Sequence, residues 1–360
     1  MNAFRSLFHC FLRPRTFGIA ALIAAGGLCQ QGFALTIIPT FDSTITSDTN
    51  AANIEATIND CIADHDAAIL DPAVVHITFE EYSGLGTSFF YFLTFNYSAY
   101  RSNLVNKATS AEDITAVGTL PNSTTNPVNG NNSVGMTPPL ARIMGLSTFT
   151  NDGMIGLNIS ACNVNPETDT DPSKYALYAV ASHEIDEILG GGGPGSSLDV
   201  STNFNPTGPI GVTDLFRYSA SGVRSYNTNA STTCYLSIDG GVTSLVPFNQ
   251  SDQGDFGDFA SSTPLVQNAF GSPGAQPSMS VEWNMMDVIG YNWNGHTNVW
   301  CNSTVSTQVG TVYHPDSFPT ALSAVPHGGV ILMKAGTYSQ PGLISTVCQL
   351  RAVNGTARIQ

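Results

Sequence analysis

A clear helical pattern lies near the middle of the chain. Apolar residues follow one another at helical spacing from Tyr175 to Leu189, and a run of glycines, 190–193, comes directly after them. Glycine commonly ends helices because it adopts left-handed backbone angles without a steric penalty. Ser173 precedes the pattern and is a residue type that caps helices. The sequence therefore predicts a helix that is capped by Ser173 and stops at Gly190.

Hydrophobic patterns on either side of this helix predict a sheet with helices packed against it. Runs of β-branched and aromatic residues predict strands at 35–41, 73–79 and 89–97. Helical spacing and capping residues predict helices at 49–69, 100–107, 110–120 and 279–290. A hairpin with an Asp-Gly-Gly turn is expected at 235–248, and the alternation at 154–159 is typical of a half-buried or edge strand. Together these elements predict an α+β fold.

The pattern changes from about residue 296 to the end of the chain. A short helix near Ser317 is followed by Pro-x-Gly-Gly, a strand at 330–338 and a last strand around Asn-Gly-Thr. This succession resembles the first coil of a pectin-lyase-like parallel β-helix. One coil cannot bury its own apolar face, so we expect it either to continue in a longer protein or to dock on the preceding domain. A complete β-helix would favour carbohydrate or surface binding, and a small appendage that caps the fold is the alternative.

The N-terminal residues have the pattern of a secretory signal peptide. Arginines precede an apolar run at 17–28, and small residues follow up to Ala34. This order predicts cleavage near Ala34 and export to the periplasm or the extracellular space, with an uncleaved anchor as the alternative. No later stretch is apolar and long enough to span a bilayer, so no stable membrane insertion is expected after cleavage. The expected division is thus a signal at 1–34, a main domain at 35–295 and a C-terminal segment at 296–360.

The net charge and the number of cysteines indicate which partners to exclude and which disulfides to expect. The chain has 360 residues and a formal net charge of −15, which argues against nucleic acid and anionic membranes as partners. Five cysteines remain after a signal is removed, which in an exported protein predicts one or two disulfides and one free thiol. The preferred pair is Cys301 with Cys348, because both lie in the C-terminal segment.

The central helix carries the candidate chemistry. His183 and Glu187 are four residues apart, so on a helix they project from one face, and Glu184 follows His183 directly. This is the spacing of the HExxH zinc helix with a glutamate in place of the second histidine. Glutamate ligates zinc as histidine does, and Glu184 would then be the general base for a metal-bound water. The alternative is a solvated acidic face without a metal.

Five segments together resemble a family of exported bacterial proteins classed as metalloproteases. They read HEIDEILG, DLFRYSASGVRSY, YLSIDGGVTSL, GDFGDF and MMDVIGYN. The resemblance extends from about Leu35 to about Trp293. The same region is also distantly similar to the metzincin zinc proteases. It implies a zincin-like mixed sheet beside an active-site helix, a zinc ion and proteolysis. In such proteases an edge strand next to the helix binds extended substrate by strand addition, and 154–159 is the expected strand.

The chain departs from the metzincin pattern at two of the three ligands. Glu187 replaces the second histidine, and Gly193 stands where the third is expected. A third ligand must therefore come from another acid. Asp214 is the first candidate because it follows a flexible Gly-Pro loop, and Asp199 and Asp186 are the alternatives. One histidine with two carboxylates would also suit manganese or iron.

A second acidic cluster lies in a glycine-rich turn. Asp252, Asp255 and Asp258 follow one another at three-residue spacing, which does not match an EF-hand loop. A solvated turn is the favoured interpretation, and a structural calcium site is the alternative.

These patterns predict a secreted zinc-dependent metallopeptidase that acts on protein or peptide substrates. In this hypothesis His183, Glu187 and Asp214 hold the metal, and Glu184 moves the proton during hydrolysis. The competing hypothesis is a metal-stabilised surface-binding or adhesion protein without catalysis. The absence of the second and third histidines is the feature that favours this alternative.

Overall fold

The computed structural model describes residues 34–198, 205–306, 308–339, 342 and 344–360. The proposed signal peptide, apart from Ala34, lies outside these residues, and so does Asp199. Among the described residues, no helix combines the length and the apolar character that crossing a bilayer requires. The described residues fold as a mixed α/β structure with several small sheets.

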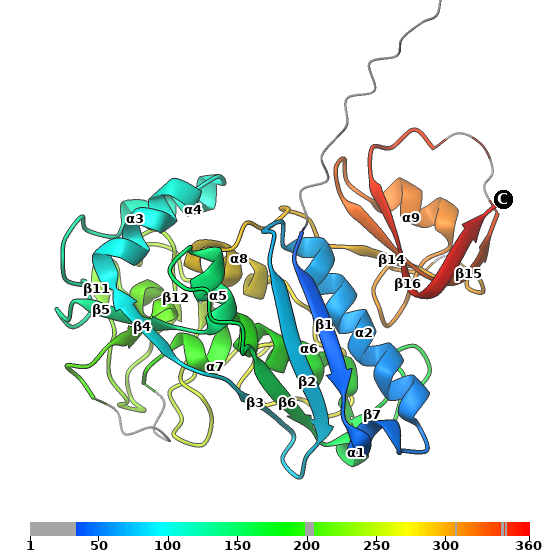
Figure 1. Ribbon diagram of the computed structural model, residues 1–360, viewed down its shortest axis with the longest axis horizontal. Coiled ribbons are helices and arrows are strands. Elements are labelled where there is room, and N and C mark those ends of the chain that lie inside the picture. The colour runs from blue at the N-terminus through cyan, green and yellow to red at the C-terminus, as the bar shows by residue number, and fades with distance from the viewer. Residues whose placement is uncertain (1–33, 199–204, 307, 340–341, 343) are drawn as a thin grey trace, which may run out of the picture. The chain divides into compact units, whose positions relative to one another are not determined.

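The main sheet has four strands in the order β1-β2-β6-β3 (Figure 1). Their bounds are β1 Thr36–Phe41, β2 Val74–Glu81, β6 Gly153–Leu157 and β3 Gly86–Phe89. The first three are parallel, and β3 is antiparallel to β6. The predicted strands at 35–41 and 73–79 are thus confirmed. The strand predicted at 154–159 is present as β6. Of its two interpretations, a half-buried or an edge strand, the edge strand is wrong, because β6 is paired on both sides and β3 is the edge. Alternation reports which faces of a strand are covered and not whether its two edges are paired.

Two long helices pack against each other and against this sheet. They are α2, Ala51–Ala68, and α6, Leu177–Leu189. Helix α2 runs alongside β1 and buries the face that carries Ile54, Ile58 and Ile62, as its spacing predicts (Figure 1). Helix α6 begins later than predicted, because Tyr175–Ala176 pair as β8 with β7, Cys162–Asn163. Ser173 is therefore not its N-cap.

The segment predicted as one strand at 89–97 is divided between two sheets. It contributes the end of β3 and then β4, Leu93–Asn96, which pairs with β5 in the sheet β4-β5-β9. A third sheet, β11-β10-β12-β13, contains the predicted hairpin with its Asp-Gly-Gly turn. The bounds of these strands are β5 Ser133–Met136, β9 Ile210–Gly211, β10 Arg217–Ala220, β11 Val223–Arg224, β12 Tyr235–Leu236 and β13 Val246–Pro247.

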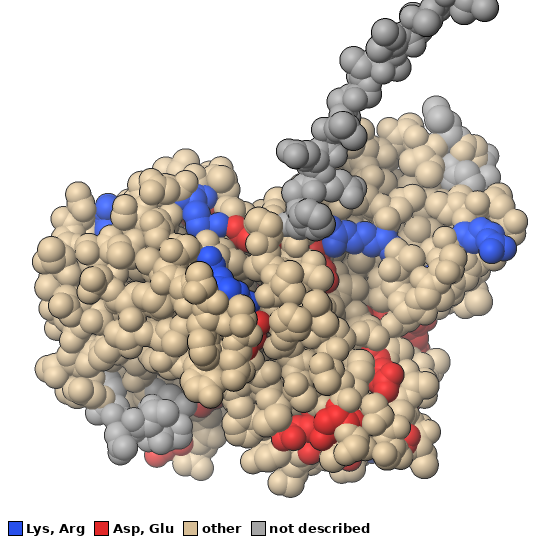
Figure 2. Space-filling view, viewed as in Figure 1, with Lys and Arg blue, Asp and Glu red and all other residues tan. Residues whose placement is uncertain are grey.

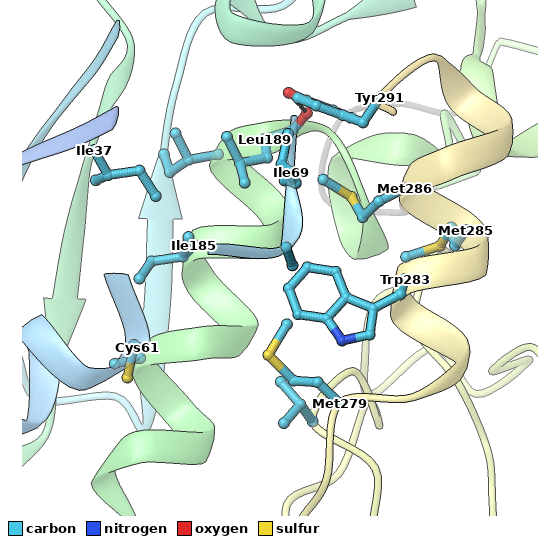
Figure 3. Packing of buried hydrophobic residues seen from close by; sticks show 14 of the residues in the cluster. Ile37, Cys61, Ile69, Ile185, Leu189, Met279, Trp283, Met285, Met286 and Tyr291 are labelled. Carbon is cyan, nitrogen blue, oxygen red and sulfur yellow. Dashed lines mark hydrogen bonds between the residues drawn. The ribbon is translucent and has the colours of Figure 1, made fainter. Parts of the chain in front are cut away.

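The remaining predicted helices are present with shifted ends. They are α3 Tyr97–Lys107, α4 Ala111–Gly118 and α8 Val281–Ile289, and short helices occur at α1 Ser43–Thr46, α5 Pro138–Ile143 and α7 Gly192–Gly195. Ser110 caps α4 in a capping box with Asp113, as expected. Helix α8 packs its apolar side chains into the same core as α6. Figure 3 shows the residues that meet there, namely Ile185 and Leu189 from α6 and Trp283, Met285 and Met286 from α8.

The C-terminal segment is a three-stranded parallel sheet that docks on the main domain. Its elements are β14 Val299–Cys301, α9 Phe318–Ala324, β15 Val330–Tyr338 and β16 Gln349–Ile359. Trp300, Leu332 and Val353 join the main core, and the opposite side chains form a second small core with α9. Lys334 also pairs with Asp60 of α2. The docking alternative is therefore the one observed within the described residues, which belong to a single compact unit from Gly32 onward.

The five cysteines of the described residues are all free thiols. The expected Cys301–Cys348 bond is not formed. Cys301 is fully buried in the second core, whereas Cys348 lies at its partly exposed margin.

Charged side chains are sparse on the surface, in line with their share of 11% of the sequence. Figure 2 shows acidic residues gathered over the lower ends of the main strands and separate from most of the lysines and arginines. Glu81 at the end of β2 lies near Asp48 and Asp42, and partial burial together with these neighbours raises the pKa of Glu81.

Candidate metal centre

Helix α6 presents His183, Glu184 and Glu187 toward one cavity. The helix is buried along almost its whole length and ends at Gly190, whose φ of 102° lies in the left-handed region. His183 and Glu187 are one turn apart, with 3.6 Å between His183 Nε2 and Glu187 Oε1. The predicted helix end and the predicted common face of these two residues are confirmed.

A third carboxylate reaches this pair from a distant loop. Asp258 Oδ2 lies 3.5 Å from His183 Nε2. One ligand-type atom each from His183, Glu187 and Asp258 lie within 4.8 Å of one another. For bonds of about 2.1 Å in a tetrahedral site, neighbouring ligand atoms are about 3.4 Å apart. The two distances to His183 Nε2 are therefore close to those of a formed divalent cation site.

Hydrogen bonds orient both α6 ligands for this role. His183 Nδ1 lies 2.9 Å from the carbonyl oxygen of Val266. Because a carbonyl only accepts, Nδ1 carries the proton and the Nε2 lone pair faces Glu187 and Asp258. Ser88 of β3 donates its hydroxyl to Glu187 Oε2 at 2.5 Å, which leaves Oε1 directed toward His183.

The electrostatics of the cluster are dominated by burial and by the neighbouring acids. Burial raises the pKa of Asp258 to about 8, against the attraction of His183. Burial and the neighbouring Glu187 raise the pKa of Glu184 well above its usual value. Burial opposes a charged His183, yet Asp258, Glu187 and Glu184 outweigh it and raise the pKa of His183. Three buried carboxylic acids thus share one imidazole, and a divalent cation would balance their charge.

Glu184 lies beside the cluster and is not one of its three members. Its side chain is 5% exposed, and its Oε2 atom has no hydrogen-bond partner among the described residues. Gly86 of β3 approaches so closely that a Cβ atom there would lie 2.3 Å from Glu184 Oε1. Strand β3 therefore fixes the position of this carboxyl group as well as that of Glu187.

The loop that carries Asp258 is anchored by close backbone packing and by Arg217. A Cβ atom on Gly257 would lie 1.9 Å from the carbonyl oxygen of Gly192, so only glycine fits against the glycine run. Arg217 is 1% exposed and donates to the carbonyl oxygens of Phe256 and of Asn249, the latter at 3.0 Å. Arg217 therefore has a structural role here.

The structure does not bring Asp214 to the cluster. Its carboxylate accepts hydrogen bonds from Ser196 Oγ at 2.6 Å and from the backbone N–H groups of Ser197 and Gly211, both at 2.9 Å. Those bonds close the loop after the glycine run and occupy both carboxylate oxygens. Asp186 is also engaged elsewhere, because its Oδ1 pairs with His65 Nε2 at 3.1 Å in the interior. The expected third ligand is therefore corrected from Asp214 to Asp258.

The prediction of a solvated acidic turn is wrong for Asp258, which is only 2% exposed. A signal for this was present in the sequence, because Phe256 and Phe259 flank the acid and both are fully buried. A turn that carries two large apolar side chains packs against the core and does not face solvent. The flanking phenylalanines were thus a better guide to Asp258 than the aspartate spacing.

The cluster opens into a cavity of about 760 Å³. Its walls are formed by β3, α6, the glycine run and the loops around Asp255 and Leu265. Apolar side chains line much of it, including Leu85, Phe90, Phe92, Tyr175, Val180 and Leu265. Apolar walls around a few convergent polar groups are typical of ligand sites.

Comparison with known proteins adds no family to this picture. No protein-family model, curated protein or solved structure matches the chain.

Proposed function

We propose that this protein is a metal-dependent peptidase whose divalent cation, zinc in the first instance, is held by His183, Glu187 and Asp258. The observation that carries the proposal is the convergence of these three groups and Glu184 at one end of a large cavity. The donor set fits a cation, because the buried acids outnumber the one imidazole and its Nε2 atom, which Val266 does not engage, faces them. One imidazole and two carboxylates also suit manganese or iron.

Glu184 is the proton carrier in this proposal. A bound divalent cation would acidify a water molecule and polarise a carbonyl group. Glu184 takes a proton from the attacking water and passes it to the leaving amine. Its Oε2 atom, which has no hydrogen-bond partner among the described residues, and its close approach to β3 suit this role.

Strand β3 supplies a binding edge for an extended peptide. Among the described strands, only β6 pairs with it, and residues 85–88 line the cavity beside Glu184 and Glu187. A peptide added along this edge would place a scissile bond against the helix α6. This assigns to β3 the role that the sequence gave to 154–159. Export from the cytoplasm remains part of the proposal.

The proposal is tested with purified protein, measured metal content and cleavage of casein and of a defined peptide mixture. Glu184→Gln should keep the metal and lose about 100-fold or more of the activity. Glu112→Gln makes the same change on an exposed face of α4 and should alter neither property. Stoichiometric metal without any cleavage would contradict the peptidase and favour a metal-stabilised binding protein. Absence of bound metal would contradict both.

A further inference from the structure

The side-chain amide of Gln267 lies inside the proposed metal centre. Its Nε2 atom is 3.2 Å from His183 Nε2 and 2.9 Å from Asp258 Oδ1. The residue is fully buried. Its Oε1 atom is buried too and has no hydrogen-bond partner among the described residues. A buried amide oxygen without a hydrogen-bond partner costs free energy and so requires an explanation.

The chain holds this amide against the centre from several sides. The backbone N–H of Gln267 donates to Glu282 Oε1 at 3.0 Å, and its carbonyl accepts from the N–H of Phe259 at 2.8 Å. Gly192, with φ of 58°, packs so closely that a Cβ atom there would lie 2.0 Å from Gln267 Nε2. The preceding residue, Val266, orients His183. The position of the amide is therefore built into the same loops that assemble the cluster.

In the structure the amide presents its NH₂ group, and not its oxygen, to the cluster. The NH₂ group donates to the Asp258 carboxylate and points at the lone pair of His183 Nε2. An amide N–H cannot ligate a cation, whereas an amide oxygen can. A half rotation about the last side-chain bond exchanges the two atoms and leaves the rest of the residue in place.

We propose that Gln267 is a further ligand of this centre, which turns its amide on cation binding and contributes Oε1. The inference rests on the metal site proposed above. The spacing supports it, because cis ligand atoms at about 2.1 Å from one ion lie about 3.0–3.4 Å apart. The terminal amide atom is 2.9 and 3.2 Å from its two neighbours in the cluster. The rotation of the amide also explains why Gln267 Oε1 has no hydrogen-bond partner, because this oxygen would bind the cation.

The test uses Co²⁺ titration of the purified protein, read by its d–d absorption and by competition with a chelator. Gln267→Leu should raise the Co²⁺ Kd about tenfold or more and change the d–d band, because an oxygen donor is lost. Gln267→Glu is nearly isosteric and should bind Co²⁺ at least as tightly as the wild type. Gln253→Glu adds the same charge at the exposed rim of the cavity and should change neither readout. Apo-protein thermal melts check that each variant folds.

The glutamate variant separates a ligand from a mere donor. If Gln267 only donates to Asp258, Gln267→Glu places two acceptors side by side and weakens Co²⁺ binding as much as Gln267→Leu does. That result overturns the proposal, and so does a Gln267→Leu protein with wild-type Kd and spectrum. A wild-type protein that binds no Co²⁺ overturns the metal centre itself. Normal Co²⁺ binding without peptide cleavage overturns the peptidase and leaves the role of Gln267 standing.

Discussion

Gly86 of β3 gives the sharpest test of how the sheet edge positions the proposed base. A Cβ atom at this position would lie 2.3 Å from Glu184 Oε1 and 2.8 Å from Val180 Cγ1, whereas ordinary contact begins at 3.4 Å. The Gly86→Ala variant must therefore displace the carboxyl group or the strand by about 1 Å. Overpacking of this kind costs about 1–3 kcal/mol of stability. A misplacement of about 1 Å in a reacting group costs about 100-fold in rate.

The assay is the ratio kcat/KM for peptide cleavage, measured beside the Kd for Co²⁺. We expect kcat/KM to fall about 100-fold while the Kd stays at its wild-type value, because Glu184 is not among the three clustered ligands. Gly118→Ala is the matched control, since a Cβ atom on that α4 residue meets nothing within 4 Å. Wild-type kcat/KM in Gly86→Ala would refute the argument that β3 fixes Glu184.

Three other changes probe the ligands, the loop and the buried acids. Asp258→Asn should raise the metal Kd about 100-fold or more, with Asp255→Asn in the same cavity as the control, measured by chelator competition. Arg217→Met should lower the free energy of unfolding in urea by about 2–4 kcal/mol and weaken metal binding, because it leaves two carbonyls without donors. Burial raises the pKa of Asp66 to about 7, above its unfolded value, so the folded protein loses stability as the pH rises from about 4 to 7. Asp66→Asn should remove that loss. The check is the free energy of unfolding in urea at pH 4.5 and at pH 8, and an equal change between these pH values in the wild type and the variant would contradict the prediction.

The local features of the fold could be predicted from the sequence because they depend on residues close in the chain. The apolar spacing and the glycine run gave the body and the end of α6, and the spacing of His183 and Glu187 gave their common face. The start of α6 could not be predicted in this way. Tyr175–Ala176 carry residues compatible with a helix, and their pairing with β7 decided their conformation. The prediction of an edge strand at 154–159 was wrong for the same reason, since the whole fold decides which strands pair in a sheet.

The third carboxylate of the centre shows where local reasoning ends. Asp214 and Asp258 both follow glycine-rich loops, so composition and spacing do not separate them. They differ in what surrounds them after folding. Asp214 accepts hydrogen bonds from two backbone N–H groups and from Ser196. Asp258 instead faces His183, from a loop in which Gly257 packs against the glycine run and Arg217 donates to two carbonyl oxygens.

The same distinction explains why Gln267 carried no signal in the sequence. A lone glutamine has no motif, and its meaning comes from the two neighbours that meet its amide, Asp258 and His183. A carboxylate that was already satisfied by backbone donors would gain little from a cation, because its charge is stabilised where it lies. Burial raises the pKa of both Asp214 and Asp258. Asp258, however, faces His183 and Gln267 in place of backbone donors, so a cation there would relieve a cost that burial imposes. Asp258 and Gln267 are thus recognised by the side chains that meet them after folding, and not by their own place in the sequence.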